Sequence, residues 1–363
     1  MSTTNRKRKP LITEWVETFI QLISVQGRKT IETSRLARAA VVIVTCSVVS
    51  TAQAIAWGEQ DLNNEYPNVA YLRGIVENTP PVLPIARFNC SGSLLHIDAK
   101  KVVILTAAHC TDIWREEIAA GRLDTVGISF DQNNLVGSPP LLERYVRGGV
   151  PISLPEKDAP FEKLDYGLVI FSTTSVNPAG ETIQARWGGN PGALNPVQMP
   201  PDEEYVSDLV DSMRHATEPL SFTAVGYGTG ERFPIPGQEK GPADPNDSNM
   251  TTSRIRYFAD RLSYNAYNPT NDVLRFSQNI ATGNNGTCTG DSGGPIFHED
   301  ADIGRVQVSL VSGGDQVCRA TSTGPGFSRQ EAFDFLGCGK IEGDASKVRE
   351  CVESTFGVAS TPR

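Results

Sequence analysis

Short apolar segments recur along residues 55–336, and turn-forming residues separate them. Each segment has three to eight residues, is rich in Val, Ile, Leu and Phe, and lies between clusters of Gly, Pro, Asn and Asp. They span residues 69–76, 93–97, 102–105, 125–130, 168–171, 222–225, 295–297 and 306–311. Many short strands with few helical stretches predict an antiparallel barrel or sandwich protein.

Two segments rich in Pro and Gly interrupt this pattern. Residues 177–204 are predicted to link two β units, and residues 231–252 to form an exposed insertion in the second unit. One helical stretch, residues 330–336, is predicted to close the β region. Residues 337–363 then form a C-terminal extension.

The first 54 residues have a different pattern. Arg35 and Arg38 precede an uncharged segment, residues 39–50, and small residues follow in the sequence Ala52-Gln53-Ala54. Basic, then apolar, then small residues are typical of an export signal, here cleaved after Ala54. Residues 39–57 carry no charge over 19 positions, so the alternative is an anchor that stays in the membrane.

An amphipathic pattern precedes the export signal. Apolar side chains lie at helical spacing at Ile12, Trp15, Val16, Phe19, Ile20 and Ile23. Three interpretations stay open: a helix on a membrane surface, an extended leader, or upstream sequence joined to the chain by a wrong start.

The charge of the chain changes sign where the leader ends. All 363 residues together have a formal net charge of -9, but residues 1–54 carry eight basic and three acidic side chains. The remaining residues carry 25 basic and 39 acidic side chains, a net charge of -14. Such an acidic chain, with four His and seven Cys, fits neither a basic nucleic-acid-binding protein nor a metal-rich module. We therefore expect no nucleic-acid partner and no metal.

Three short motifs contain the residue types that nucleophilic catalysis requires. They are Thr-Ala-Ala-His-Cys at 106–110, Leu-Asp-Tyr-Gly-Leu-Val at 164–169, and Gly-Asp-Ser-Gly-Gly-Pro at 290–295. A serine hydroxyl is a weak nucleophile near neutral pH, so it needs a base beside it. That base needs an anion to hold its tautomer and stabilise its cationic form. Ser292, His109 and Asp165 supply these groups.

In this order, and with Cys-Ser-Gly-Ser-Leu-Leu at 90–95 before them, the motifs resemble those of the trypsin/chymotrypsin-like serine endopeptidases. The resemblance covers residues 55–336. It implies two antiparallel six-stranded β-barrels, about residues 55–176 and 216–336, with a short C-terminal helix and the active site between the barrels. It also implies hydrolysis of peptide bonds through an acyl-enzyme on Ser292, without a cofactor. The backbone N–H groups of Gly290 and Ser292 would form the oxyanion hole.

The resemblance gives Asp291 a separate role. In the family, the carboxylate at this position is buried and pairs with the free α-amino group of a mature N-terminus that reads Ile-Val-Gly-Gly. Here Ile55-Ala56-Trp57-Gly58 follows the predicted cleavage site directly. Export cleavage would therefore create the activating N-terminus, and Ile55 would pair with Asp291.

The expected substrate pocket departs from that of trypsin. The resemblance places the pocket at Gly286, Thr287, Ser312, Gly314 and Gly326, with Ser312 also supporting Asp165. Gly286 occupies the position where trypsin-like members carry an Asp that pairs with basic side chains. The pocket is therefore expected to be open and uncharged and to prefer an apolar or aromatic P1 residue. Small P1 residues, or a basic P1 residue held by Asp315, are the alternatives.

Six of the seven cysteines lie beyond Ala54, and none forms a CxxC or Cys/His zinc pattern, so three disulfides are expected in an exported protein. The resemblance pairs Cys90 with Cys110 and Cys288 with Cys318, and leaves Cys338 and Cys351 to each other. Cys46 lies in the leader.

The expected protein is a secreted monomer that contacts a membrane only through its signal segment. Its partners are protein or peptide substrates and protein inhibitors. The alternative from another class is a non-catalytic homologue that acts as a binding protein. Such proteins usually lose a triad residue, whereas this chain retains all three.

Overall fold

The computed structural model describes residues 55, 58–76, 88–134, 144–154, 164–216, 220–228, 254–315 and 318–356. The predicted leader (residues 1–54) and the predicted insertion (residues 231–252) lie outside the described residues. Among the residues that are described, no helix is long and apolar enough to cross a membrane.

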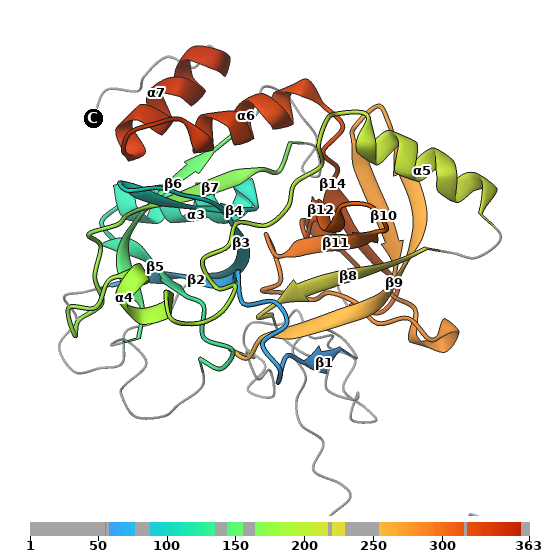
Figure 1. Ribbon diagram of the computed structural model, residues 1–363, viewed down its shortest axis with the longest axis horizontal. Coiled ribbons are helices and arrows are strands. Elements are labelled where there is room, and N and C mark those ends of the chain that lie inside the picture. Colours follow the sequence, from blue (N-terminus) through green and yellow to red (C-terminus); the bar gives the residue numbers. More distant parts are fainter. Residues whose placement is uncertain are drawn as a thin grey trace, which may run out of the picture. The chain divides into compact units, whose positions relative to one another are not determined.

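Six antiparallel strands form a closed barrel in the order β2-β3-β4-β7-β6-β5 (Figure 1). The strands are β2 (Val69–Ile75), β3 (Asn89–Ile97), β4 (Lys101–Thr106), β5 (Thr125–Ser129), β6 (Val146–Ser153) and β7 (Gly167–Ser172). Their packing is close, because a Cβ at Gly149 of β6 would lie 2.6 Å from the ring of Phe171. The predicted first barrel is confirmed.

A second antiparallel sheet of eight strands has the order β12-β11-β8-β9-β10-β14-β13, with β1 paired to β9. The strands are β1 (Glu59–Gln60), β8 (Ser221–Gly226), β9 (Tyr257–Asn268), β10 (Val273–Ser277), β11 (Pro295–Asp300), β12 (Gly304–Leu310), β13 (Gly313–Gly314) and β14 (Thr321–Pro325). Over the described residues this sheet is not a closed barrel. The two-residue β13 ends the sheet by pairing with β14. An isolated bridge, Ser309 to Gly326, links β12 at the other end of the sheet to the residue that follows β14.

The eight predicted apolar segments all fall within or overlap strands, but they do not cover the two-residue strands β1 and β13, nor β6, β9, β10 and β14. Strand β9 shows the reason. Its sequence YFADRLSYNAYN has few aliphatic side chains, and buried and exposed positions do not alternate along it. Such a strand lacks the period of two by which a half-buried strand is identified.

The helices lie outside the two sheets. They are α3 (Ala108–Ala119), α4 (Ile183–Trp187), α5 (Tyr205–His215), the 3-10 helix η2 (Ile280–Thr282), α6 (Gln330–Lys340) and α7 (Ala345–Phe356). The predicted helix at 330–336 is confirmed as part of α6. The predicted linker contains α4, whose Trp187 is buried and donates from Nε1 to Asp131 Oδ1 at 2.8 Å. The linker is therefore packed against the first barrel.

Helices α6 and α7 form a hairpin that packs on the first barrel (Figure 1). The Cys338–Cys351 disulfide joins the two helices. A Cβ at Gly339 would lie within 3.4 Å of Leu95, Val103 and Leu168 of the barrel. Most of the C-terminal extension is thus an integral part of the fold.

A buried ion pair connects the start of the described chain with both sheets. Arg256 Nε donates to Asp61 Oδ2 at 2.7 Å, and neither side chain is exposed to solvent. The same guanidinium donates to the carbonyl oxygens of Val69 and Phe130 and to the hydroxyl of Tyr227. These bonds satisfy the buried charge and fix the segment after Ile55.

Candidate active site

His109 and Asp165 lie at adjoining edges of the first barrel and are hydrogen-bonded to each other. His109 lies in the first turn of α3, directly after β4, and Asp165 lies just before β7. His109 Nδ1 is 2.8 Å from Asp165 Oδ2, and the backbone N–H of His109 donates to Asp165 Oδ1 at 2.8 Å. The hydroxyl of Ser312 donates to Asp165 Oδ2 at 2.6 Å. Three hydrogen bonds therefore fix this buried carboxylate.

These contacts determine the tautomer of His109. An ionised carboxylate only accepts hydrogen bonds, so Nδ1 of the imidazole carries the proton that lies between the two groups. In the neutral ring Nε2 is then the acceptor. The imidazole is partly exposed, whereas Asp165 is buried. His109 therefore has the geometry of a general base that a buried anion orients.

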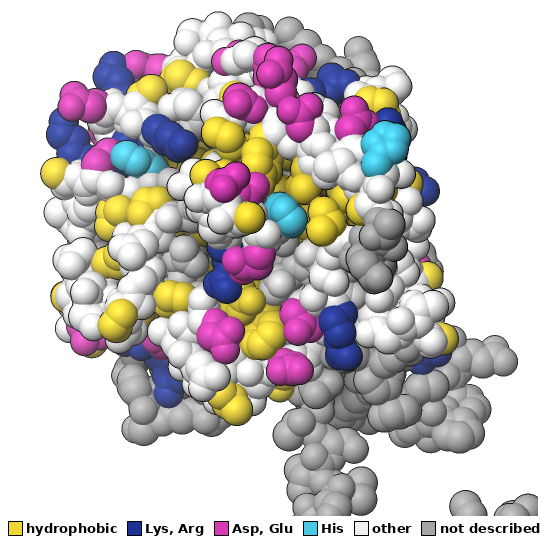
Figure 2. Space-filling model, turned by 45° about the vertical axis from the view of Figure 1, so that its right-hand side comes forward, with side chains coloured by type: hydrophobic (Ala, Val, Ile, Leu, Met, Phe, Trp, Pro, Cys, Tyr) yellow, Lys and Arg dark blue, Asp and Glu magenta, His cyan; other side chains and the backbone are white. Residues whose placement is uncertain are grey.

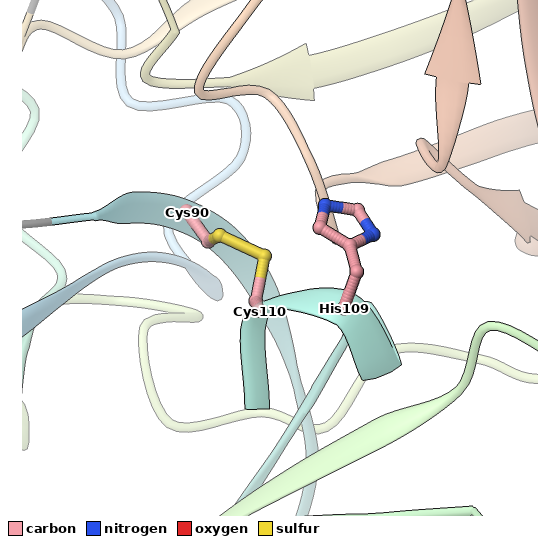
Figure 3. Close-up of side chains that lie close together, drawn as sticks. All are labelled: Cys90, His109 and Cys110. Atoms are coloured by element: carbon pink, nitrogen blue, oxygen red, sulfur yellow. A yellow bond between two sulfur atoms is a disulfide. The ribbon is translucent and has the colours of Figure 1, made fainter. Parts of the chain in front are cut away.

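Figure 3 shows His109 beside the Cys90–Cys110 disulfide. One donor atom from each of these three residues lies within 4.8 Å of the others, a spacing that could hold a metal ion. The two sulfur atoms are bonded to each other, however, and so provide no thiolate ligands. The cluster is a histidine held next to a disulfide.

Ser292 lies in a tight turn, residues 290–294, that leads into β11. Gly290 and Gly293 have φ angles of 94° and 79°, which residues with a side chain rarely adopt. A Cβ at Gly293 would overlap the hydroxyl of Thr106 and lie 2.6 Å from the backbone nitrogen of Ala107. The turn thus packs directly against the segment that leads to His109. The partly exposed Ser292 hydroxyl makes no hydrogen bond with another described residue.

The backbone N–H groups of this turn fall into two sets. Three donate to carbonyl oxygens: Asp291 to Cys288 (3.1 Å), Gly293 to Val311 (2.7 Å) and Gly294 to Asp291 (2.7 Å). Those of Gly290 and Ser292 have no acceptor among the described residues. These two donors are available to bind an anionic oxygen next to Ser292.

Asp291 is completely buried under the turn. Its Oδ1 accepts from the backbone N–H of Gly228 at 2.7 Å, and its Oδ2 accepts from that of Cys288 at 2.8 Å. Burial raises the pKa of this carboxyl from 3.8 to about 7, although the two backbone hydrogen bonds oppose the shift. Among the described residues Asp291 has no ion-pair partner. The carboxyl group of Asp291 is thus buried without a counterion among the described residues.

Ile55, the expected partner of Asp291, is buried as well. Its φ angle is 59°, a left-handed conformation that is unfavourable for a β-branched residue. In the uncleaved chain its nitrogen is part of a peptide bond and carries no charge. The side chain of Ile55 is thus already buried in the uncleaved chain, but its nitrogen cannot yet form the expected ion pair with Asp291.

Part of the predicted substrate pocket is built around a glutamine that the sequence does not predict. A Cβ at Gly286 would overlap the side chain of Gln278, which is buried. Gln278 Oε1 accepts from the N–H of Thr287 at 2.8 Å, and its amide donates to Asp315 Oδ1 at 3.4 Å. The hydroxyls of Thr287 and Ser322 are 2.7 Å apart. This region is polar and buried.

Strand β14 brings two further predicted pocket residues to the same place. The N–H of Ser312 donates to the carbonyl of Thr323 at 3.0 Å, and Gly314 pairs with Ser322. Gly286, Thr287, Ser312 and Gly314 are therefore connected through Gln278 and β14. No sequence motif identifies Gln278, Ser322 or Thr323, because strand pairing brings them to the site.

Gly326, the fifth predicted pocket residue, has other neighbours. Its N–H donates to the carbonyl of Asp272 at 2.7 Å, and its own carbonyl accepts from the hydroxyl of Tyr166. Gly326 thus links the second sheet to the residue after Asp165. The hydroxyl beside that of Thr287 belongs to Ser322.

The three disulfides are those that the sequence predicts: Cys90–Cys110, Cys288–Cys318 and Cys338–Cys351. Cys46 lies outside the described residues. No family model matches the chain, and a search of curated proteins finds no match either. Any function must therefore be inferred from the chemistry of the site and from its motifs.

We expect the stability of the full-length chain to fall as the pH rises from about 4 to about 7. Folded Asp291 keeps its proton up to about pH 7, whereas an unfolded Asp releases it near its ordinary pKa of 3.8. The folded state binds more protons in this window, so raising the pH favours unfolding, by several kcal/mol over the window.

Urea unfolding of the full-length chain at pH 4.5 and pH 8 measures this difference. Asp291→Asn keeps the shape of the side chain and should abolish most of the pH dependence. Asp302→Asn, at an exposed aspartate, is the control and should not alter it. Equal pH dependence in wild type and Asp291→Asn would contradict the assignment.

Proposed function

We propose that this chain is a secreted serine endopeptidase of the trypsin/chymotrypsin-like class. The observation that carries the proposal is the 2.8 Å contact of His109 with buried Asp165, next to the turn that presents Ser292. Such an arrangement combines a nucleophile, an oriented base and an anion. The two available N–H groups of the turn add an electrostatic site for a developing negative charge.

Acylation of the enzyme uses all of these groups. Ser292 Oγ attacks the carbonyl carbon of the scissile peptide, and His109 Nε2 takes the hydroxyl proton. Asp165 stabilises the resulting imidazolium, and the N–H groups of Gly290 and Ser292 donate to the oxyanion. The C–N bond then breaks, and the leaving amine takes the proton from His109. The N-terminal part of the substrate remains as an ester on Ser292.

Water completes the cycle by the same route. His109 removes a proton from a water molecule, which attacks the ester carbon while the two N–H groups again hold the oxyanion. The bond to Ser292 Oγ breaks, and His109 returns a proton to the serine. The products are a carboxylic acid and an amine, and no cofactor takes part.

In this proposal the second sheet corresponds to the second barrel of the family. Residues 55–336 form the peptidase domain. The bridge between Ser309 and Gly326 supports this view, because it links β12, at one end of the sheet, to the residue that follows β14, near the other end. Residues 308–314, which include β13, would bind the substrate backbone as an added strand. The substrate would lie between the two β units, where the turn with Ser292 packs against the segment that leads to His109.

Export would also activate the enzyme. Cleavage after Ala54 gives Ile55 a free α-amino group, which is the counterion that Asp291 lacks. The ion pair would hold the oxyanion turn in its active form, and cleavage also removes the constraint on the φ angle of Ile55. An uncleaved anchor would leave the same enzyme tethered and inactive.

The pocket is proposed to accept an apolar P1 side chain. Gly286 brings no charge, and the side chain next to it is the neutral amide of Gln278. The carboxylate of Asp315 accepts from the backbone N–H groups of Arg319, Ala320 and Thr321, which already compensate its charge. A basic P1 residue therefore finds no uncompensated acid at this place.

The proposed compartment is extracellular. Three disulfides suit an oxidising environment, and the leader has the features of an export signal. Acidic side chains are spread over the face shown in Figure 2, in agreement with the net negative charge from residue 55 onward. Substrates and inhibitors are proteins or peptides, and the enzyme acts as a monomer.

A fluorophosphonate probe is expected to label Ser292 in the processed protein, and the chain should cleave peptides. Ser292→Ala should abolish labelling. His109→Ala or Asp165→Asn should lower turnover by about 10⁴-fold, the loss typical of this class of enzyme. Ser354→Ala, at an exposed serine of α7, is the control and should leave labelling intact. A processed protein without an adduct on Ser292 would instead be a non-catalytic binding protein.

The mature protein is expected to begin at Ile55, which N-terminal sequencing can test. One alanine inserted between Ala54 and Ile55 should lower activity at least 100-fold, because the α-amino group moves one residue away from Asp291. Gln53→Ser changes only the discarded leader and should have no effect. Full activity of a chain with a different N-terminus would contradict the activation mechanism.

Peptide-library profiling is expected to show best cleavage after apolar or aromatic P1 residues. Asp315→Asn should leave this preference unchanged, because Asp315 interacts with backbone N–H groups and not with the substrate. A preference for Arg or Lys that is lost in Asp315→Asn would show that Asp315 binds the P1 side chain.

A further inference from the structure

Ser91 of β3 holds the Ser292 turn from the first barrel. It is completely buried. Its N–H donates to the carbonyl of Ser292 at 2.8 Å, and its hydroxyl donates to the carbonyl of Gly290 at 3.1 Å. One residue therefore fixes the carbonyls on both sides of Asp291.

The hydroxyl of Ser91 has a second bond that determines its orientation. Its oxygen accepts from the backbone N–H of Tyr227 at 2.9 Å, and its proton is then used for Gly290. The carbonyl of Ser91 accepts from Thr106 Oγ1 at 2.7 Å. Each polar group of Ser91 therefore has a defined partner, and the orientation of its hydroxyl is fixed.

Gly290 needs such a constraint. Its φ angle of 94° is in the region that glycine visits readily, and no side chain restricts rotation of the peptide that follows it. Because a peptide group is planar, a hydrogen bond to its carbonyl fixes the whole plane. The Ser91 hydroxyl thus restrains the backbone between the two N–H donors, those of Gly290 and Ser292.

The same hydroxyl connects this turn to the surroundings of Asp291. It accepts a hydrogen bond from the backbone N–H of Tyr227, which lies between Gly226 and Gly228. A Cβ at either glycine would contact the Asp291 carboxyl. Gly228 also donates its N–H to Asp291. Ser91 therefore links the two chain segments that enclose the buried carboxylate.

We propose that Ser91 is a positioning residue for catalysis: its hydroxyl orients the Gly290 peptide so that the N–H groups of Gly290 and Ser292 converge on one oxyanion. This inference rests on the proposed peptidase function. Ser91 acts through the turn and does not touch the substrate. Its loss should therefore weaken binding of the tetrahedral transition state more than binding of the substrate.

Ser93 provides a matched control. It lies two residues further along β3, is also buried, and its hydroxyl donates to Gln307 Oε1 at 2.7 Å. Ser93→Ala therefore removes a buried hydrogen bond between the same strand and the second sheet, but not a bond to the Ser292 turn. The two alanine variants should have similar thermal stability.

The test measures kcat, KM and the inhibition constant of a peptide aldehyde, whose adduct places an oxyanion at the site. Ser91→Ala is expected to lower kcat about 10-fold to 100-fold with KM changed less than about threefold, and to weaken aldehyde inhibition similarly. Ser91→Gly should do the same, because it also lacks the hydroxyl. Ser91→Thr, which keeps it, should recover part of the loss.

Kinetics of Ser91→Ala and Ser91→Gly that match those of Ser93→Ala would overturn the inference. A rise in KM with unchanged kcat would overturn it too. These failures are distinct from failure of the proposed function, which would appear as a wild-type protein that neither cleaves peptides nor reacts with a fluorophosphonate.

Discussion

The burial of the Asp291 carboxyl is the constraint on which the rest of the site depends. An isolated charge in a protein interior costs several kcal/mol, so the group either keeps its proton or acquires a counterion. Two backbone N–H groups, from Gly228 and Cys288, compensate the charge in part, and the pKa still rises to about 7. The turn with Ser292 is therefore built on a carboxyl group that can gain stability from a cation. In the proposed mechanism, export cleavage provides that cation at Ile55, which is already buried.

The site also depends on bonds that join the two β units. His109 and Asp165 belong to the first barrel, whereas Ser292 and Ser312 belong to the second sheet. The bonds of Ser312 to Asp165 and of Ser91 to the Ser292 turn connect them directly. In the proposed mechanism the nucleophile and its base must be held close to the productive geometry. Strand pairing within each β unit alone could not guarantee this, so buried polar bonds between the two units set their relative position.

The sequence predicts the disulfides, most strands of the first barrel and the three residues of the proposed triad, but not the polar contacts that position the site. Motifs such as Thr-Ala-Ala-His-Cys can be identified because their chemistry requires fixed residue types at short spacing. The Thr287–Ser322 contact spans 35 residues, and the Arg256–Asp61 pair spans 195. Which polar residue meets which over such separations depends on strand register, and a one-residue shift would turn each side chain to the other face. For the same reason no motif predicts that Ser322 lies beside Thr287.

Lys101 shows why the C-terminal extension belongs to the fold and is more than an appendage. Its ammonium group is almost completely buried, which is costly unless its protons are bonded. It donates to Asp98 and to the carbonyl of Ile341, the residue directly after α6. The last carbonyls of a helix have no partners within it, and the negative end of the helix dipole favours a cation there. The ammonium group of Lys101 thus gains an acceptor, and the carbonyl at the end of the helix gains a donor. The segment between α6 and α7 therefore accepts one of the hydrogen bonds of a lysine that is buried in the first barrel.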